Sequence, residues 1–221
     1  MPMTLSSARN RIVRRAAREV RAGMTVNLGI GLPTQIVKYL DSELPVCLHS
    51  ENGIAGAGPA VSRDQANRNL IDAGGDYIST LPGASFFDSA VSFALVRGGR
   101  LDLALLGALQ VAANGDLANW MIPGRFAPGV GGGMELAQKS RRVVALTTHC
   151  DKHGQSKIVR KCTLPLTAPG CVDRIITELA VIDIRDEKMV LREIAEGIAI
   201  DDLVTATDAS LSIDESTIKT F

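Results

Sequence analysis

The sequence of 221 residues is poor in several residue types, and each shortage excludes a class of protein. Aromatic residues make up 4% of the chain, and Lys plus Arg equals Asp plus Glu at 24 each. A chain without net charge and with few aromatics lacks the basic, aromatic-studded surface that binds nucleic acid. No apolar run reaches the roughly 20 residues that a membrane span needs. We therefore expect neither nucleic acid nor a membrane as a partner.

Histidine and cysteine are also scarce, with three and four copies. The cysteines form no C-x-x-C pair, and no zinc-ligand spacing occurs, so we expect no metal site. We interpret the cysteines as buried thiols in a reducing compartment, which favours a cytoplasmic location. Three histidines are too few to nominate a hydrolase triad, and the G-x-S-x-G and Walker A motifs are absent.

The remaining composition is that of an ordinary globular domain, with 46% apolar and 22% charged residues. Short apolar runs alternate with helix-like segments, which predicts an α/β fold with an open, mostly parallel sheet. We expect a single domain over residues 1–221, with the residues after about 207 as a peripheral tail. The expected strands are at 24–28, 46–48, 77–81, 101–106 and 142–147, and the expected helices at 34–40, 86–97 and 200–206.

The first 21 residues contain six arginines, as a transit peptide does. However, apolar residues from Ile12 to Val20 fall on one face of a helix. Ser6 or Ser7 can cap that helix, and Gly23 can end it. The pattern therefore favours a folded first helix over a targeting segment.

The segment His49-Ser50-Glu51-Asn52-Gly53 places a carboxylate beside a turn dipeptide. Asn-Gly is typical of a surface turn, which is the plainer interpretation. The glycines continue as Gly56 and Gly58, more than a two-residue hairpin needs, and small residues there leave room for a ligand. Because sites in α/β folds gather at strand ends, Glu51 is also a candidate catalytic carboxylate.

Residues 26–34 (VNLGIGLPT) begin like the dinucleotide-binding motif G-x-G-x-x-G. Thr34 replaces the third glycine, and no acidic residue is well placed about 20 positions further on. The segment instead predicts a tight strand-to-helix turn at Gly29 and Gly31, whose exposed amides a substrate can approach.

Residues 114–133 are rich in glycine and proline, and predict a long irregular excursion. Long ordered loops inside a compact domain are usually functional. At its end, residues 128–135 read PGVGGGME. Consecutive glycines either form a flexible loop or aim backbone N–H groups at an anion, and composition alone leaves both open. A helix expected near Met134 favours the anion-binding interpretation.

Residues 48–56 (LHSENGIAG) resemble the signature of the family I CoA-transferases, in their β or catalytic subunit. The resemblance implies an open α/β sheet of the NagB/RpiA/CoA-transferase type, with helices on both faces. It also implies a separate α subunit, an α₂β₂ heterotetramer and an active site between the subunits. Five further segments also resemble the family and occur in the same order as in its members: 26–33 (VNLGIGLP), 81–85 (LPGAS), 115–124 (GDLANWMIPG), 157–167 (KIVRKCTLPLT) and 172–176 (VDRII).

The resemblance implies that Glu51 is the nucleophile. Attack on an acyl-CoA would give an acyl-glutamyl anhydride and then a Glu51–CoA thioester, with ping-pong kinetics. Backbone amides at Gly131 and Gly132 would stabilise the oxyanion. The resemblance implies no tightly bound cofactor, because the coenzyme A thioester is itself a substrate.

Five further residues are expected around this nucleophile. Asn52 and Gly53 would shape its turn, Gly29 and Gly31 would leave space beside it, and Asn119 would line the acyl pocket. All five are therefore candidate substrate- or CoA-binding residues.

The resemblance is strongest to 3-oxoacid CoA-transferases, which use succinyl-CoA or acetyl-CoA with acetoacetate, and residues 121–124 (MIPG) support that branch. A 3-oxoadipate or short-chain fatty acid CoA-transferase is the alternative. A non-catalytic ligand-binding subunit is a further alternative, against which the intact signature argues. Sugar-phosphate isomerases and deaminases of related fold would need phosphate-binding clusters that the sequence does not contain.

Overall fold

The computed structural model describes residues 4–125, 127 and 129–221. None of the helices in this part of the chain combines the length and the apolar character required to cross a membrane. The helices are α1 Leu5–Ala17, the 3₁₀ helix η1 Pro33–Tyr39, α2 Ser89–Arg97, α3 Gly133–Lys139 and α4 Ile200–Ala206.

Most strands belong to one large mixed sheet, in which 11 described strands follow the order β13-β12-β11-β10-β8-β5-β1-β2-β3-β4, with β14 paired to β12. A small second sheet has the order β7-β6-β9. The strands are β1 Thr25–Leu28, β2 Cys47–Ser50, β3 Ile54–Ala60, β4 Ile78–Phe86, β5 Leu103–Gly107, β6 Gln110–Ala112, β7 Leu117–Ala118, β8 Val143–Leu146, β9 Ile158–Val159, β10 Arg174–Ile176, β11 Ala180–Arg185, β12 Lys188–Ile194, β13 Leu211–Ser212 and β14 Lys219–Thr220.

The centre of the large sheet is parallel, because β10, β8, β5, β1 and β2 all run in the same direction. Antiparallel strands extend it on both sides, β3 and β4 beyond β2, and β11 and β12 beyond β10. The predicted α/β class with an open, mostly parallel sheet is confirmed. Parallel strands bring their carboxyl ends to one edge, which is where sites form in such sheets.

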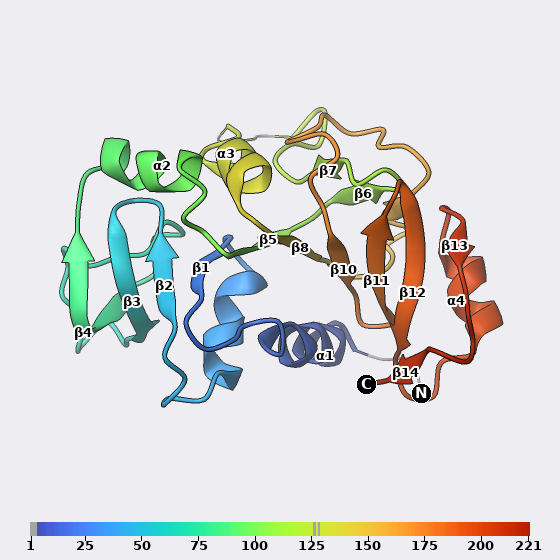
Figure 1. Cartoon of the computed structure of the whole chain (residues 1–221), viewed down its shortest axis with the longest axis horizontal. Coiled ribbons are helices and arrows are strands. Elements are labelled where there is room, and N and C mark those ends of the chain that lie inside the picture. Colours follow the sequence, from blue (N-terminus) through green and yellow to red (C-terminus); the bar gives the residue numbers. More distant parts are fainter. Residues whose placement is uncertain (1–3, 126, 128) are drawn as a thin grey trace.

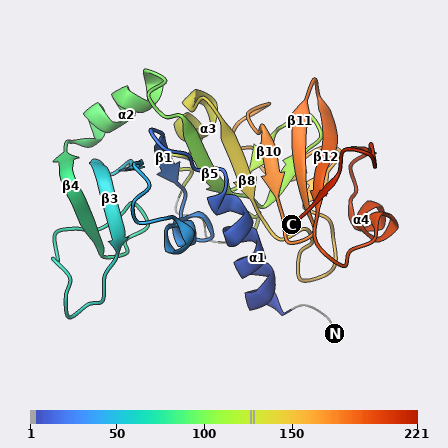
Figure 2. The same ribbon diagram turned by 60° about the horizontal axis from the view of Figure 1, so that its bottom comes forward.

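Helices cover both faces of the sheet, with α2 and α3 on one side and α1 on the other (Figures 1 and 2). The central strands are accordingly buried on both faces and alternate between two apolar cores. On β5, Ala104 and Leu106 face the core beneath α2 and α3, whereas Leu103 and Leu105 face the core beneath α1 and η1. This explains why residues 101–106 are almost continuously apolar.

Three local details differ from expectation. Thr4 caps α1, accepting a hydrogen bond from the Ser7 amide at 3.2 Å, instead of Ser6 or Ser7. The helix expected at 34–40 is present, but as the 3₁₀ helix η1. Residues 54–58 belong to strand β3, although their glycines suggested a turn; pairing with both β2 and β4 overrides their weak strand propensity.

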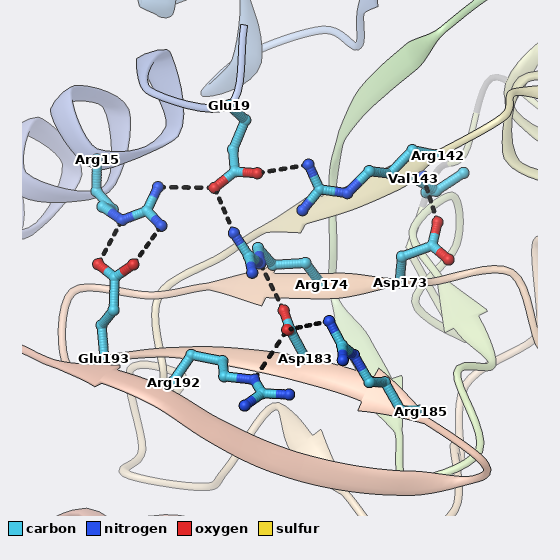
Figure 3. A network of polar contacts seen from close by, with 10 residues as sticks. All are labelled: Arg15, Glu19, Arg142, Val143, Asp173, Arg174, Asp183, Arg185, Arg192 and Glu193. Atoms are coloured by element: carbon cyan, nitrogen blue, oxygen red, sulfur yellow. Dashed lines mark hydrogen bonds and ion pairs between the residues drawn. The ribbon is translucent and has the colours of Figure 1, made fainter. Parts of the chain in front are cut away.

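A buried ionic network joins the end of α1 to the sheet (Figure 3). The Glu19 carboxylate, 4% exposed, accepts hydrogen bonds from Arg15 at 2.7 Å, Arg142 at 2.7 Å and Arg174 at 2.8 Å. Burial alone would raise the pKa of Glu19, but the hydrogen bonds from Arg15 and Arg174 outweigh it and lower this pKa to about 2. The network continues to Asp183, which pairs with Arg174, Arg185 and Arg192, and to Glu193, which pairs with Arg15.

Residues after about 207 lie at the β12 edge of the sheet. There β13 and β14 each pair with β12 in parallel. Leu211, Ile213 and Ile218 pack against the core on the α2 and α3 side, and Phe221 packs against the other core.

Candidate active site

Glu51 lies in the tight turn that joins β2 to β3, immediately beyond the carboxyl end of β2. Ser50 and Ile54 are opposite each other in the antiparallel pair, so residues 51–53 form the loop. Gly53 has a φ of +122°, and a Cβ at this position would lie 1.9 Å from the carbonyl oxygen of Phe87. The Phe87 amide donates to the Gly53 carbonyl at 3.0 Å. Only glycine can therefore make this turn, and the segment before α2 holds it in place.

The half-buried side chain of Glu51 has one hydrogen-bond donor in the described residues. Asn27 Nδ2 donates to Glu51 Oε2 at 3.0 Å, and also to the His49 carbonyl oxygen at 3.2 Å. Asn27 lies in β1 and is fully buried. A neutral amide thus fixes one carboxylate oxygen and leaves the charge of the carboxylate without a cationic partner.

A cavity of about 710 Å³ opens beside Glu51, which is a volume typical of small-molecule sites. Its walls come from Gly29 after β1, Glu51 after β2, Gly107 at the end of β5, and the start of α3. The cavity therefore lies at the carboxyl ends of the parallel strands, on both sides of β1, where the chain order reverses. Glu51 is the only charged side chain among the described lining residues.

Six of the eight predicted site residues meet at this cavity: Gly29, Glu51, Asn52, Asn119, Gly131 and Gly132. The other two, Gly31 and Gly53, do not line it. Gly31 is exposed in the turn before η1, where its carbonyl accepts a hydrogen bond from Thr34 Oγ1 at 3.0 Å. Gly53 forms the hairpin turn described above.

Gly132 is the residue of the triple glycine that approaches Glu51. A Cβ added to Gly132 would lie 3.5 Å from Glu51 Cγ and 2.7 Å from Phe93 Cζ, so a side chain here would displace Phe93. The amides of Gly131 and Gly132 donate to no acceptor within the described residues. The loop thus brings to the wall that carries Glu51 two N–H groups that have no acceptor among the described residues. Pro128, the first residue of the predicted loop, lies outside the described residues.

The two asparagines have different surroundings. Asn119 Oδ1 accepts from Thr167 Oγ1 at 2.6 Å, while the Asn119 side-chain amide meets no acceptor in the described part of the chain. Asn52 is exposed, and its Nδ2 donates to the Ile71 carbonyl at 2.8 Å. Asn119 therefore has donors available at the cavity, whereas Asn52 also ties the Glu51 turn to a neighbouring loop.

Sequence reasoning assigned no role to Asn27, His49, Ser92 or Phe93. Asn27 and His49 are polar residues inside apolar strand segments and are buried, at 0% and 4% exposure. Such residues require partners, because a buried polar group without one is costly. That signal was present in the sequence. The approach of Phe93, in α2, to Gly132, the residue before α3, has no local signature.

The described residues contain no candidate metal centre. No group of three or more His, Cys, Asp or Glu side chains there is arranged to hold a metal ion. All four cysteines are free thiols and partly buried.

Comparisons with known proteins agree with this geometry. The model of a family described as coenzyme A transferase matches residues 9–206. One subunit of a probable succinyl-CoA:3-ketoacid coenzyme A transferase from Bacillus subtilis is 44% identical over 97% of this chain and 99% of its own length. The β subunit of the acetate CoA-transferase of Escherichia coli K12 is 48% identical over 93% of this chain and 94% of its own length.

Among solved structures, an acyl-CoA transferase apoenzyme from Escherichia coli O157:H7 superimposes with a TM-score of 0.78 at 22% sequence identity. The match covers 100% of this chain and 44% of that chain. At this identity the likeness concerns the fold.

Proposed function

Because this chain belongs to the coenzyme A transferase family, we propose that it is the catalytic subunit of a two-subunit CoA-transferase, with Glu51 as its nucleophile. The observation that carries the proposal is the position of Glu51. It is the one charged side chain among the described residues of the cavity wall, it lies at a strand end, and Gly132 passes beside it. Transfer of CoA between carboxylates exchanges one thioester for another, so a covalent relay suffices and no energy source is needed.

The relay has two halves. Glu51 Oε1 attacks the acyl-CoA carbonyl and the carbon–sulfur bond breaks. This step releases CoA thiolate and forms an acyl-glutamyl anhydride. The thiolate then attacks the Glu51 carbonyl carbon, which releases the first carboxylate and forms a Glu51–CoA thioester. An acceptor carboxylate attacks this thioester to form a new anhydride, and the returning thiolate takes the acyl group, restoring the Glu51 carboxylate.

The amides of Gly131 and Gly132 are suited to stabilise the oxyanions of this relay. Both lie at the cavity wall and neither has an acceptor within the described residues. Removal of one such donor costs about 3–4 kcal/mol of barrier in other enzymes. Asn119, whose amide is likewise available, is suited to orient the acyl group. Gly29, Gly31, Asn52 and Gly53 complete the proposed site by shaping the turns around it.

We propose an α subunit as the partner, in an α₂β₂ assembly. Two relatives are named as single subunits of such enzymes, one of them as the β subunit. Succinyl-CoA carries a free carboxylate, yet the described cavity lining contains no Lys or Arg. The α subunit would supply the group that recognises this carboxylate. Large apolar side chains near the site, Ile30 at 67% and Phe86 at 64% exposure, offer a surface for it.

The substrates we propose are succinyl-CoA or acetyl-CoA as donor and a 3-oxoacid such as acetoacetate as acceptor, in line with the Bacillus subtilis relative. Transfer to short-chain fatty acids is the second candidate, because the β subunit of the acetate CoA-transferase of Escherichia coli is 48% identical to this chain. Transfer to 3-oxoadipate, a cytoplasmic location and a single domain with a peripheral tail after about residue 207 also stay predictions.

The test combines trapping with a substrate panel. The chain, assembled with its α subunit, is mixed with succinyl-CoA or acetyl-CoA, digested, and the peptide containing Glu51 is weighed. A CoA adduct on that peptide, absent from Glu51→Gln, is the expected result; full activity of Glu51→Gln would overturn the proposal. Rates with acetoacetate, 3-oxoadipate and acetate under identical conditions then separate the candidate acceptors.

A further inference from the structure

A line of side-chain contacts leads from α2 through β2 and β1 to Glu51. Ser92 Oγ lies 3.0 Å from His49 Nε2, and His49 Nδ1 lies 3.3 Å from Asn27 Nδ2. Asn27 Nδ2 in turn lies 3.0 Å from Glu51 Oε2. Ser92 and Asn27 are fully buried and His49 is 4% exposed, so water does not compete for these contacts.

The surroundings of Asn27 fix the direction of every bond in this line. The Asn27 amide group faces the His49 carbonyl oxygen and the Glu51 carboxylate, both of which only accept hydrogen bonds. The atom between them must therefore be the nitrogen. That nitrogen also faces His49 Nδ1, so its two protons are shared among three neighbours. A proton on Nδ1 would point at the amide protons, so the ring proton lies on Nε2, where it donates to Ser92 Oγ.

The ring of His49 is held in this state by its environment. Burial lowers the pKa of His49 to about 4, so the ring is neutral at ordinary pH. Phe87 stacks on it, with centroids 6.2 Å apart and an angle of 16° between the planes. A second proton on Nδ1 would point at the Asn27 donor, so a charged ring would oppose the observed arrangement.

The other end of Asn27 indicates that the arrangement serves more than stability. Asn27 Oδ1 is buried and has no hydrogen-bond partner among the described residues, which is a destabilising situation. An apolar residue at this point of a strand buried on both faces would avoid that cost. The hydrogen bond that Asn27 makes to Glu51 gives a reason for its presence.

We propose that His49 is a positioning residue for the proposed reaction: its Nε2–H tautomer, fixed by Ser92, orients the Asn27 amide toward Glu51 Oε2 and leaves Glu51 Oε1 directed to the acyl-CoA. This inference rests on Glu51 being the nucleophile. Without Nδ1, the buried Asn27 amide loses one of the three neighbours that fix its orientation, so its hydrogen bond to Glu51 Oε2 bends or lengthens and Glu51 moves away from its attacking geometry.

The matched variants are His49→Gln and His49→Met, which have side chains of similar length and volume. Glutamine offers an acceptor for Asn27 and a donor for Ser92, whereas methionine offers no comparable pair. Each is assembled with the α subunit. We expect His49→Met to lower kcat about 10- to 100-fold with little change in KM, and His49→Gln to recover kcat to within about 3-fold of the wild type. Equal kcat values for the two variants would overturn the proposal.

A second measurement uses Ser92→Ala, which removes the partner of the ring proton without touching the cavity. We expect a smaller fall in kcat, and no further loss when Ser92→Ala is added to His49→Met, because both act through the same contact. Additive losses of kcat would contradict the inference that Ser92 acts through His49.

The rate at which the Glu51–CoA adduct forms in a single turnover distinguishes a failure of the role proposed for His49 from a failure of the role proposed for Glu51. An adduct that forms on the wild type and at an unchanged rate on His49→Met removes the role of His49 but keeps the nucleophile. An adduct that never appears on Glu51 in the wild type removes the proposed reaction itself, and the positioning role with it.

Discussion

Glu19 is buried and Glu51 is half-buried, and the protein surrounds the two carboxylates in opposite ways. Glu19, 4% exposed, is surrounded by three arginines, which hold its pKa at about 2 although burial acts to raise it (Figure 3). Glu51 receives one hydrogen bond, from a neutral amide, and faces a cavity of about 710 Å³. The guanidinium groups occupy the lone pairs of Glu19, whereas Glu51 retains an oxygen that has no donor among the described residues.

The two sites use the same side chain differently, Glu19 for structure and Glu51 for chemistry. A carboxylate whose charge is compensated by several arginines stabilises the fold and is a poor nucleophile. A carboxylate with one neutral donor keeps its charge available for a bond to carbon. The same substitution, Glu to Gln, should therefore have opposite consequences at the two positions.

The largest expected effect is on catalysis at Glu51. Glu51→Gln keeps the shape of the side chain but removes the nucleophile, so we expect kcat to fall by about 10⁴-fold or more. The urea midpoint should change little, because Glu51 compensates no buried charge. Steady-state rates and urea unfolding of the same preparation measure both quantities. A large loss of stability with kcat retained would show that Glu51 has a structural role and not a catalytic one.

At Glu19 we expect the reverse. Glu19→Gln leaves Arg15, Arg142 and Arg174 without their shared anion, which should destabilise the fold by about 3–5 kcal/mol. The fraction that remains folded should keep the wild-type kcat. Urea unfolding gives the first quantity, and active-site-normalised rates give the second.

Local sequence patterns predict some elements of the fold and miss others, for a physical reason. Strands β1, β5 and β8 follow from apolar runs and α4 from its local pattern, because the information is local. Strand β3 was missed, since Gly56 and Gly58 favour turns and only pairing on both sides makes that segment a strand. Glu51 was found through its motif.

Apart from Arg15, which is four residues from Glu19, the partners of both carboxylates come from other parts of the chain. Arg174 is 155 residues from Glu19 in the sequence, and no periodicity reports such a contact. The approach of Gly132 to Glu51 likewise depends on how α3 packs against α2. Local patterns identify these residues as charged or as glycine, but the three-dimensional fold decides which of them meet.

A smaller effect is expected at Gly132, whose substitution tests the open side of Glu51. Gly132→Ala would place a Cβ 2.7 Å from Phe93 Cζ and 3.5 Å from Glu51 Cγ, so Phe93 or the loop must move. We expect kcat to fall about 10- to 100-fold, because small displacements of reacting groups are costly. Phe93→Leu in the same chain should recover part of the loss by making room. No recovery would indicate that the loop amides, and not the space, are affected.

The fold should also lose stability as the pH falls. Burial lowers the pKa of His49 and His149 from 6.5 to about 4, so the unfolded chain binds protons first as the pH falls. Stability should decrease between pH 6.5 and 4, by up to about 1.4 kcal/mol per pH unit for each histidine. Glu19 adds a second decrease between pH 4.5 and 2, because its folded pKa lies below its unfolded value.

Urea midpoints measured from pH 7 to pH 3 check both windows. Glu19→Gln should weaken the lower window and leave the upper one intact. An equal change in both windows would show that Glu19 is not the group responsible.

The transfer of oxygen to Glu51 tests the central claim most directly. An acceptor carboxylate labelled with ¹⁸O on both oxygens attacks the Glu51–CoA thioester, and cleavage of the resulting anhydride leaves one labelled oxygen on Glu51. After turnover, the peptide containing Glu51 should gain about 2 Da per oxygen exchanged, while the peptide containing Glu19 stays unlabelled. Turnover without label on the Glu51 peptide would contradict the covalent mechanism proposed for this carboxylate.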